Sequence, residues 1–96
     1  MIYGNAHNLK IAVAAGNGAE QDLDSIVKSE KLLKVTPTVD MFILLTATSS
    51  THAADVDDYL IKANVEYEFE VGTGIDRIAL WNATGGLGYA HVMLMY

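Results

Sequence analysis

The stretch EYEFEVGTGIDRIALW, residues 66–81, decides the fold class of this chain. It opens with glutamates at every second position from Glu66 to Glu70, and tyrosine, phenylalanine and valine stand between and after them. Because side chains of a β-strand alternate between the two faces of a sheet, this spacing predicts a strand with one wet face and one buried face. An acidic row also suits a cation or a substrate, but a half-solvated antiparallel strand requires no more than this pattern, and we expect the glutamates to be solvated.

The rest of the stretch predicts a β-hairpin. If residues 72–75 form a four-residue loop, which is a common length, the chain folds back so that Glu70 faces Arg77. One face of the hairpin is then apolar except at its loop end, and the other carries the acids with one complementary arginine. Ala79 and Trp81 fall on the acidic face, where they expose apolar surface that another subunit would cover.

Short apolar runs separated by turn residues account for most of the remaining chain. We expect strands at residues 9–15, 31–36, 41–48, 59–61 and 89–96. Gly16-Asn17-Gly18 closes the first run, because glycine and asparagine accept positive φ at low cost. Pro37 marks a bend, since it cannot donate to a central ladder, and the polar residues 49–58 predict a loop.

Residues 19–33 leave two interpretations open. Leu23, Val27 and Glu30 belong to a pattern close to a helical stripe, with acids early and lysines late, as a helix dipole favours. The other interpretation is a short strand at residues 21–23 followed by a loop. The sequence therefore predicts an all-β fold, a small antiparallel β-sandwich or jelly roll of about seven or eight short strands, with or without one short helix near residues 19–33.

Length and composition predict assembly. The chain has 96 residues, which allows one domain with a small core. We assign residues 9–96 to a single β-sandwich domain and residues 1–8 to an N-terminal arm or extended segment. Cysteine is absent, so disulfides and thiolate metal sites cannot stabilise the domain, yet 51% of the residues are hydrophobic. We expect other chains to cover the excess.

Charge and hydropathy argue against several classes of function. Six Lys and Arg against twelve Asp and Glu give a net charge of −6, so we expect no nucleic-acid binding. No apolar run approaches the roughly 18 residues that span a bilayer, and we expect no membrane insertion. Residues 1–10 carry no early positive cluster and the IAVAA run after them is short for a signal-peptide core, so we expect no export by that route.

Side chains that carry chemistry do not form a recognisable site. His7, His52 and His91 are not at metal-ligand spacing with one another. Residues 55–58, DVDD, offer oxygen ligands for calcium but lack the glycine and the closing glutamate of an EF-hand. Ser49 and His52 are not part of a G-x-S-x-G elbow. We expect no enzyme activity, no metal, no cofactor and no small-molecule substrate.

Two further motifs have structural explanations. Residues 16–18 and 85–88 are glycine-rich, but they lack the fingerprint and the following helix of a phosphate cradle, so we predict turns. Asn82-Ala83-Thr84 has the form of a glycan acceptor, although no export signal accompanies it.

The last run, YAHVMLMY at residues 89–96, is apolar on both faces. A strand of this kind needs cover on both sides, and a short chain supplies little of it, so contact with another chain is expected. Aromatic residues and methionine are enriched at the centres of interfaces. The interface residues that we predict are Ile2, Tyr3, Trp81, Tyr89, His91, Met93 and Met95.

From about Val35 onward the chain resembles small β-sandwich virion proteins of tailed bacteriophages. The resemblance lies in VTPTVDMFI at residues 35–43, DYLIKANVEYEFEV at residues 58–71, and GIDRIAL at residues 74–80, with a glycine turn into the last strand. In that family an L-I-x-A-N/G-V-P corner commonly precedes an F-x-V strand and a G-x-D-x-I-A strand. Here Glu66 stands where proline is usual.

The resemblance implies a structural virion protein, and most specifically a capsid decoration, or cement, protein. Such proteins sit as dimers or trimers on the head surface and tie neighbouring capsomers together. The implied partners are the major capsid protein and other copies of the chain, and the implied location is the capsid surface, after synthesis in the cytoplasm of the bacterial host. Residues 1–8 would then add a strand to a neighbour's sheet, or form a frayed terminus.

Two other functions stay open from the sequence. The first is a collar, tail or fibre-base component of the virion, which would be present in few copies per particle. The second is a small carbohydrate-binding β module, in which Trp81 and Tyr89 would stack on sugar rings.

Overall fold

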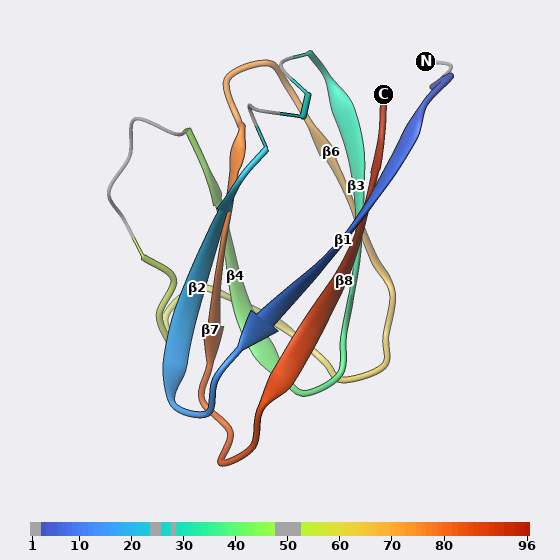
Figure 1. Ribbon diagram of the computed structural model, residues 1–96. Coiled ribbons are helices and arrows are strands. Elements are labelled where there is room, and N and C mark those ends of the chain that lie inside the picture. Colours follow the sequence, from blue (N-terminus) through green and yellow to red (C-terminus); the bar gives the residue numbers. More distant parts are fainter. Residues whose placement is uncertain (1–2, 24–25, 28, 48–52) are drawn as a thin grey trace.

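The computed structural model describes residues 3–23, 26–27, 29–47 and 53–96, and these form eight β-strands (Figure 1). The strands are β1 (Ala6–Val13), β2 (Asn17–Asp22), β3 (Lys31–Pro37), β4 (Met41–Thr46), β5 (Tyr59–Ile61), β6 (Tyr67–Val71), β7 (Arg77–Asn82) and β8 (Gly88–Met95). The described residues contain no helix with the length and apolarity needed to cross a membrane.

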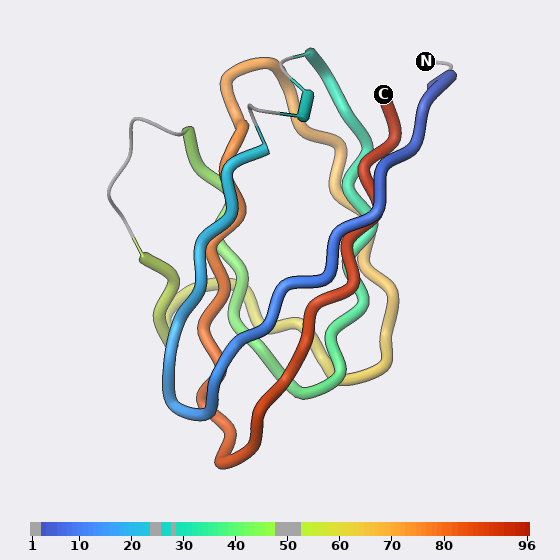
Figure 2. Tube along the Cα trace, in the orientation of Figure 1, coloured from blue at the N-terminus to red at the C-terminus, as the bar shows by residue number. Residues whose placement is uncertain are grey.

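The strands build two antiparallel sheets that face each other. One sheet, called sheet A here, has the order β1-β8-β3-β6, and the other, sheet B, has the order β2-β7-β4-β5. Along the chain, every connection crosses from one sheet to the other except that between β4 and β5, as the trace in Figure 2 shows. This is the strand order of a jelly roll. The predicted all-β sandwich or jelly roll is confirmed.

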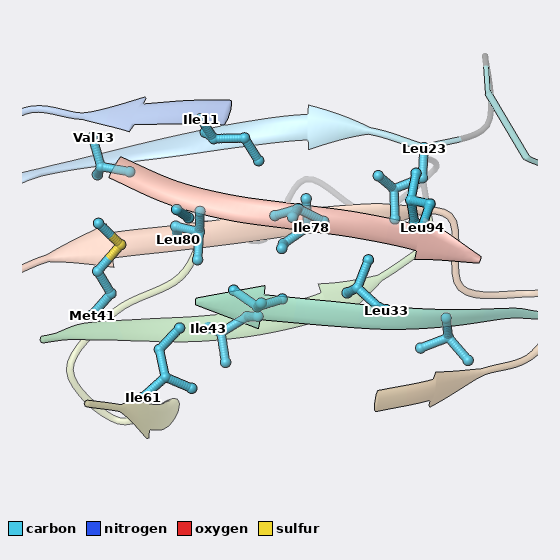
Figure 3. Packing of buried hydrophobic residues seen from close by; sticks show 14 of the residues in the cluster. Ile11, Val13, Leu23, Leu33, Met41, Ile43, Ile61, Ile78, Leu80 and Leu94 are labelled. Carbon is cyan, nitrogen blue, oxygen red and sulfur yellow. The ribbon is translucent and has the colours of Figure 1, made fainter. Parts of the chain in front are cut away.

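The core fills the space between the two sheets. Along β3 and β8, every second side chain is buried, as period-two alternation requires. Figure 3 shows side chains from both sheets meeting in one layer. The buried cluster contains Ile11, Val13, Leu23, Val27, Leu33, Val35, Met41, Ile43, Ile61, Val71, Ile78, Leu80, Ala90, Val92 and Leu94.

The hairpin predicted for residues 66–81 is wrong. Its two halves lie in different sheets, since β6 pairs with β3, whereas β7 lies between β2 and β4. Glu70 is therefore opposite Leu32, and Arg77 is opposite Asp22 and Thr46. Residues 72–76 carry the chain from one sheet to the other. Alternation of polar and apolar residues is the same for a hairpin and for such a crossover, because it records which face is buried and not which strand is the neighbour.

Residues 19–33 contain a strand and a turn, and the helix predicted as one interpretation is wrong for the described residues. The strand interpretation is right, although β2 begins at Asn17 and not at Gln21. After β2, the Leu23 carbonyl accepts hydrogen bonds from Ile26 N at 2.9 Å and Val27 N at 2.7 Å. Leu23 and Val27 are buried in the core. The helix-like spacing of these apolar residues thus reflects a single turn that covers one end of the sandwich.

Part of the predicted N-terminal segment, residues 5–8, pairs with the chain's own last strand. Asn5 N donates to the Tyr96 carbonyl at 2.8 Å, and Tyr96 N donates to the Asn5 carbonyl at 3.0 Å. From Ala6 onward the segment is part of β1 and pairs with β8. From Asn5 onward, the backbone of this segment therefore finds its hydrogen-bond partners within the same chain.

Candidate interaction surfaces

The outward face of sheet B carries a row of large apolar side chains. Trp81 of β7 is opposite Phe42 of β4, and Phe42 is opposite Leu60 of β5. Their chain neighbours Leu80 and Ile43 are buried in the core, so alternation directs these three side chains outward. We call Trp81, Phe42 and Leu60 the tryptophan row. It crosses three of the four strands of sheet B.

Gly18 lets the tryptophan lie close to the sheet. This residue of β2 is opposite Trp81, and a Cβ placed on it would lie 3.3 Å from Trp81 Cε3 and 3.1 Å from the Leu80 carbonyl oxygen. The absence of a side chain at Gly18 therefore leaves room for the indole. Trp81 and Phe42 are half-buried, while Leu60 is 39% exposed. The tryptophan row therefore packs against sheet B on its inner side and is partly exposed to solvent on its outer side.

Charged residues border the tryptophan row on one side. In the next position along the strands, Ala79 lies between Glu20 and Leu44 and is fully buried. Arg77 Nη2 lies 3.6 Å from Glu20 Oε1. An apolar centre with a charged rim is the usual composition of a protein-binding surface.

The outward face of sheet A is more polar. Tyr89, His91, Met93 and Met95 share this face of β8, and Met93 is 36% exposed. The Lys10 ammonium lies 4.3 Å from the centroid of the Tyr89 ring. A shallow hollow of about 230 Å³ runs over the middle of the sheet, and its lining includes polar groups of β1, β3 and β8 and the carboxylate-bearing Glu66. The outward face of sheet A therefore combines apolar and charged side chains.

The residues predicted for subunit contact are thus divided between opposite faces of the sandwich. Trp81 lies on sheet B, whereas the four β8 residues lie on sheet A. Tyr3 is half-buried and lines a hollow of about 290 Å³ at the Lys31 end of β3. Ile2 lies outside the described residues.

The glutamate row is exposed on the outward face of β6. Lys34 Nζ lies 3.9 Å from Glu66 Oε1 and 3.6 Å from Glu68 Oε1, and both carboxylates are more than half exposed. Exposed ion pairs of this kind contribute about 0–1 kcal/mol. The expectation of a solvated acidic row is therefore matched by its exposure and its contacts.

No group of three or more histidine, aspartate or glutamate side chains in the described part of the chain is arranged to hold a metal ion. In the DVDD segment, Asp58 Oδ2 accepts a hydrogen bond from Asp55 N at 2.8 Å, and Asp55 Oδ1 accepts one from Asp57 N at 2.8 Å. These carboxylates stabilise the turn before β5. Ser49 and His52 lie outside the described residues.

The formal glycan acceptor Asn82 is a buried structural residue. Its Nδ2 donates to the Val13 carbonyl at 3.0 Å and to the Gly86 carbonyl at 2.8 Å. Its Oδ1 accepts from Thr84 N at 2.9 Å and from Thr84 Oγ1 at 2.6 Å. The side chain therefore holds the β7–β8 turn against the end of β1, and its full burial keeps it from modification in the folded protein.

Asp40 holds the corner formed by residues 60–64. Asp40 Oδ1 accepts a hydrogen bond from Ala63 N at 2.8 Å, and Lys62 Nζ lies 3.5 Å from Asp40 Oδ2. The Ala63 N–H, aided by the Lys62 charge, holds the pKa of the Asp40 carboxyl below its ordinary value. Asn64 takes φ of 62° and donates its N–H to the Pro37 carbonyl at 2.7 Å. The L-I-x-A-N corner thus ties the β5–β6 connection to the β3–β4 bend.

Sequence reasoning missed two residues of the tryptophan row, Phe42 and Leu60. A signal for them was present, since Met41 to Leu45 are apolar at every position. A strand that is apolar at consecutive positions has one apolar face outside the core of a two-layer sandwich. Which outward neighbours that face acquires depends on strand order.

No protein-family model matches this chain, and no curated protein matches it in sequence. Among solved structures, a de novo designed double-stranded β-helix superposes with a TM-score of 0.63 at 13% identity, over 92% of this chain and 97% of the designed one. A protein of Bacillus endospore appendages, described as disulfide-linked pili, superposes with a TM-score of 0.55 at 17% identity, over 100% of this chain and 93% of its own. At these identities the likeness shows the fold alone.

Proposed function

We propose that this protein is a structural component of a bacteriophage virion, a decoration protein that binds the head surface through the tryptophan row and stabilises contacts between capsomers. The observation that supports this most is the row itself, three large apolar side chains in line on the outward face of sheet B. A protein of this kind needs a supported apolar surface and no catalytic centre.

The physical case rests on how Trp81, Phe42 and Leu60 are presented. Trp81 is positioned by its packing on Gly18, so little side-chain freedom remains to be lost on binding. Tryptophan is also among the residues that most often dominate binding energy. The net charge of −6 keeps free copies apart in solution until a partner covers the row.

The phage assignment rests on the resemblance carried by residues 35–43, 58–71 and 74–80, in which the corner at residues 60–64 is held by contacts of Asp40 and Asn64. By that assignment the partners are the major capsid protein and other copies of this chain, as dimers or trimers. The location is then the capsid surface, after synthesis in the host cytoplasm.

A binding experiment on purified heads that lack the protein tests this function. Saturable binding with copies in the hundreds per particle, counted by mass analysis of intact particles, is expected, whereas a collar or tail role predicts few copies. Leu60→Asp should weaken attachment at least tenfold, about 1.4 kcal/mol, because it places a charge in the covered row.

Leu87→Asp is the matched control, since Leu87 is 56% exposed in the β7–β8 turn and lies outside the row. It should bind like the unchanged protein. Equal binding by both variants, with both folded, would exclude the tryptophan row as the attachment surface. Failure of the unchanged protein to bind heads would exclude the decoration role.

A second candidate is a subunit of a surface filament, favoured by the fold that the chain shares with the Bacillus appendage protein over its full length. Disulfide linkage between subunits is not available to this chain, which has no cysteine. Electron microscopy of the concentrated protein separates the candidates, because a filament subunit forms fibres without heads.

A further inference from the structure

One edge of sheet A lies along β6, and β1 forms the other. The β6 strand pairs with β3 on one side and ends the strand order of the sheet on the other. In an antiparallel edge strand, alternate residues direct their N–H and C=O groups away from the sheet, and these groups can pair with an added strand. The three-residue strand β5 ends sheet B on the same side of the sandwich.

Aromatic side chains close the inner side of this edge. The Tyr59 ring meets the Tyr67 and Phe69 rings edge to face, with centroids 6.3 Å apart in both pairs. Tyr59 is nevertheless 60% exposed, and Val65 in the β5–β6 connection is 46% exposed. The inward-directed side chains of a strand added beside β6 would therefore meet the exposed side chain of Tyr59, and that of Val65 just before β6 begins.

Glutamates occupy the outer side of the same edge. Glu66, Glu68 and Glu70 are all exposed, and they are spaced so that an added strand would bring every second side chain alongside them. Lys34 approaches two of the three carboxylates from β3, so the outward face next to the edge is acidic on balance. Like charges directly opposite each other destabilise a strand pair, and β6 of a second copy is therefore a poor occupant.

We propose that the β6 edge binds an extended segment of a partner protein in which lysine or arginine alternates with apolar residues. The main chain of the segment would hydrogen-bond to β6, its basic side chains would lie beside the glutamates, and its apolar side chains would cover Tyr59 and Val65. This inference rests on the proposed function, in which the partner is a protein of the virion shell, but it concerns a surface distinct from the tryptophan row.

A peptide titration on the purified protein tests the edge directly. The probe is a short capped peptide of alternating lysine and valine, followed by isothermal titration calorimetry and by NMR shifts of β6 amides. Binding is expected, with amide shifts concentrated in β6. A peptide of alternating glutamate and valine should not bind. A lysine-valine peptide with N-methylated backbone at alternate residues should bind at least tenfold more weakly, because it keeps the charge but loses main-chain donors.

Matched variants separate this edge from general charge attraction. Glu68→Lys should reduce peptide affinity at least tenfold, and Glu68→Gln should reduce it in the same direction by less. Glu20→Lys is the control, because Glu20 is likewise an exposed strand glutamate with a cation 3.6 Å away, but on β2 in sheet B. It changes the net charge by the same amount and should leave binding unchanged.

Equal weakening by Glu68→Lys and Glu20→Lys, or equal binding of the N-methylated peptide, would overturn the proposal. So would a set of shifted amides away from β6, since the acids would then only prevent unwanted strand pairing. Head binding distinguishes this result from failure of the decoration role. If Glu68→Lys attaches to heads as well as the unchanged protein does, the edge proposal fails while the proposed function stands.

Discussion

The buried amide of Asn82 offers the sharpest test of how the fold is held together. Its side chain makes four hydrogen bonds that join the end of β1 to the β7–β8 turn. Asn82→Ala removes all four. The Val13 carbonyl loses a donor in a buried position, which costs about 1–3 kcal/mol of stability. The Thr84 and Gly86 groups can hydrogen-bond to water instead, so each of their lost bonds costs only about 0.5–1 kcal/mol.

We therefore expect Asn82→Ala to lower the free energy of unfolding by about 3 kcal/mol. For a domain of this size, that corresponds to a fall in Tm of roughly 12–24 °C. Urea unfolding followed by tryptophan fluorescence measures the free energy, and differential scanning calorimetry measures Tm. Thr84→Ala is the control, because it removes one hydroxyl and leaves the Asn82 contact with Val13 in place; it should cost about 1 kcal/mol or less. A loss below about 0.5 kcal/mol for Asn82→Ala would refute the role assigned to this side chain.

Two further predictions concern packing and pH. Gly88→Ala should destabilise the fold by about 1–3 kcal/mol, since a Cβ there would lie 2.3 Å from Val39 Cγ2, whereas Gly86→Ala, with open space around it, should have little effect on the urea midpoint. Because the Ala63 N–H lowers the pKa of Asp40, its ionised form stabilises the fold above the ordinary value of about 3.9, and this contribution is lost as the pH falls through the lowered pKa. Native protein and Asp40→Asn should therefore differ in urea midpoint at neutral pH, and the difference should shrink below about pH 4 and vanish only once the pH is below the lowered pKa; an unchanged difference throughout this acid range would show that the carboxylate charge is not involved.

The glutamate row shows how far a local pattern can predict a site. Its period of two was enough to predict one exposed and one inward face, because alternation is a property of the extended chain itself. The same pattern could not predict that Lys34 would be the neighbouring cation, since Lys34 lies on β3, far from β6 in the sequence. Arg77, the cation expected beside Glu70, instead contacts Glu20 in the other sheet.

The candidate binding surface was predictable only in part. Trp81 was singled out from the sequence as an exposed apolar residue, but its expected companions on β8 lie on the opposite face of the sandwich. Its actual companions, Phe42 and Leu60, come from strands that meet β7 only through the jelly-roll order. A surface assembled from three strands depends on pairing, and residue type alone does not reveal it.

The amino-acid sequence by itself determined most strand segments of this protein, which of their faces turn inward, and where glycine, asparagine and proline bend the chain, but it left the region of β2 open between a strand and a helix. These are consequences of backbone geometry and of side-chain hydropathy within a few residues. The tertiary structure alone decided that β6 and β7 part into different sheets and that Trp81, Phe42 and Leu60 form one row. Hairpin and crossover bury the same alternate side chains, so their free energies differ through contacts between segments distant in the sequence, and only the packed pair of sheets selects between them.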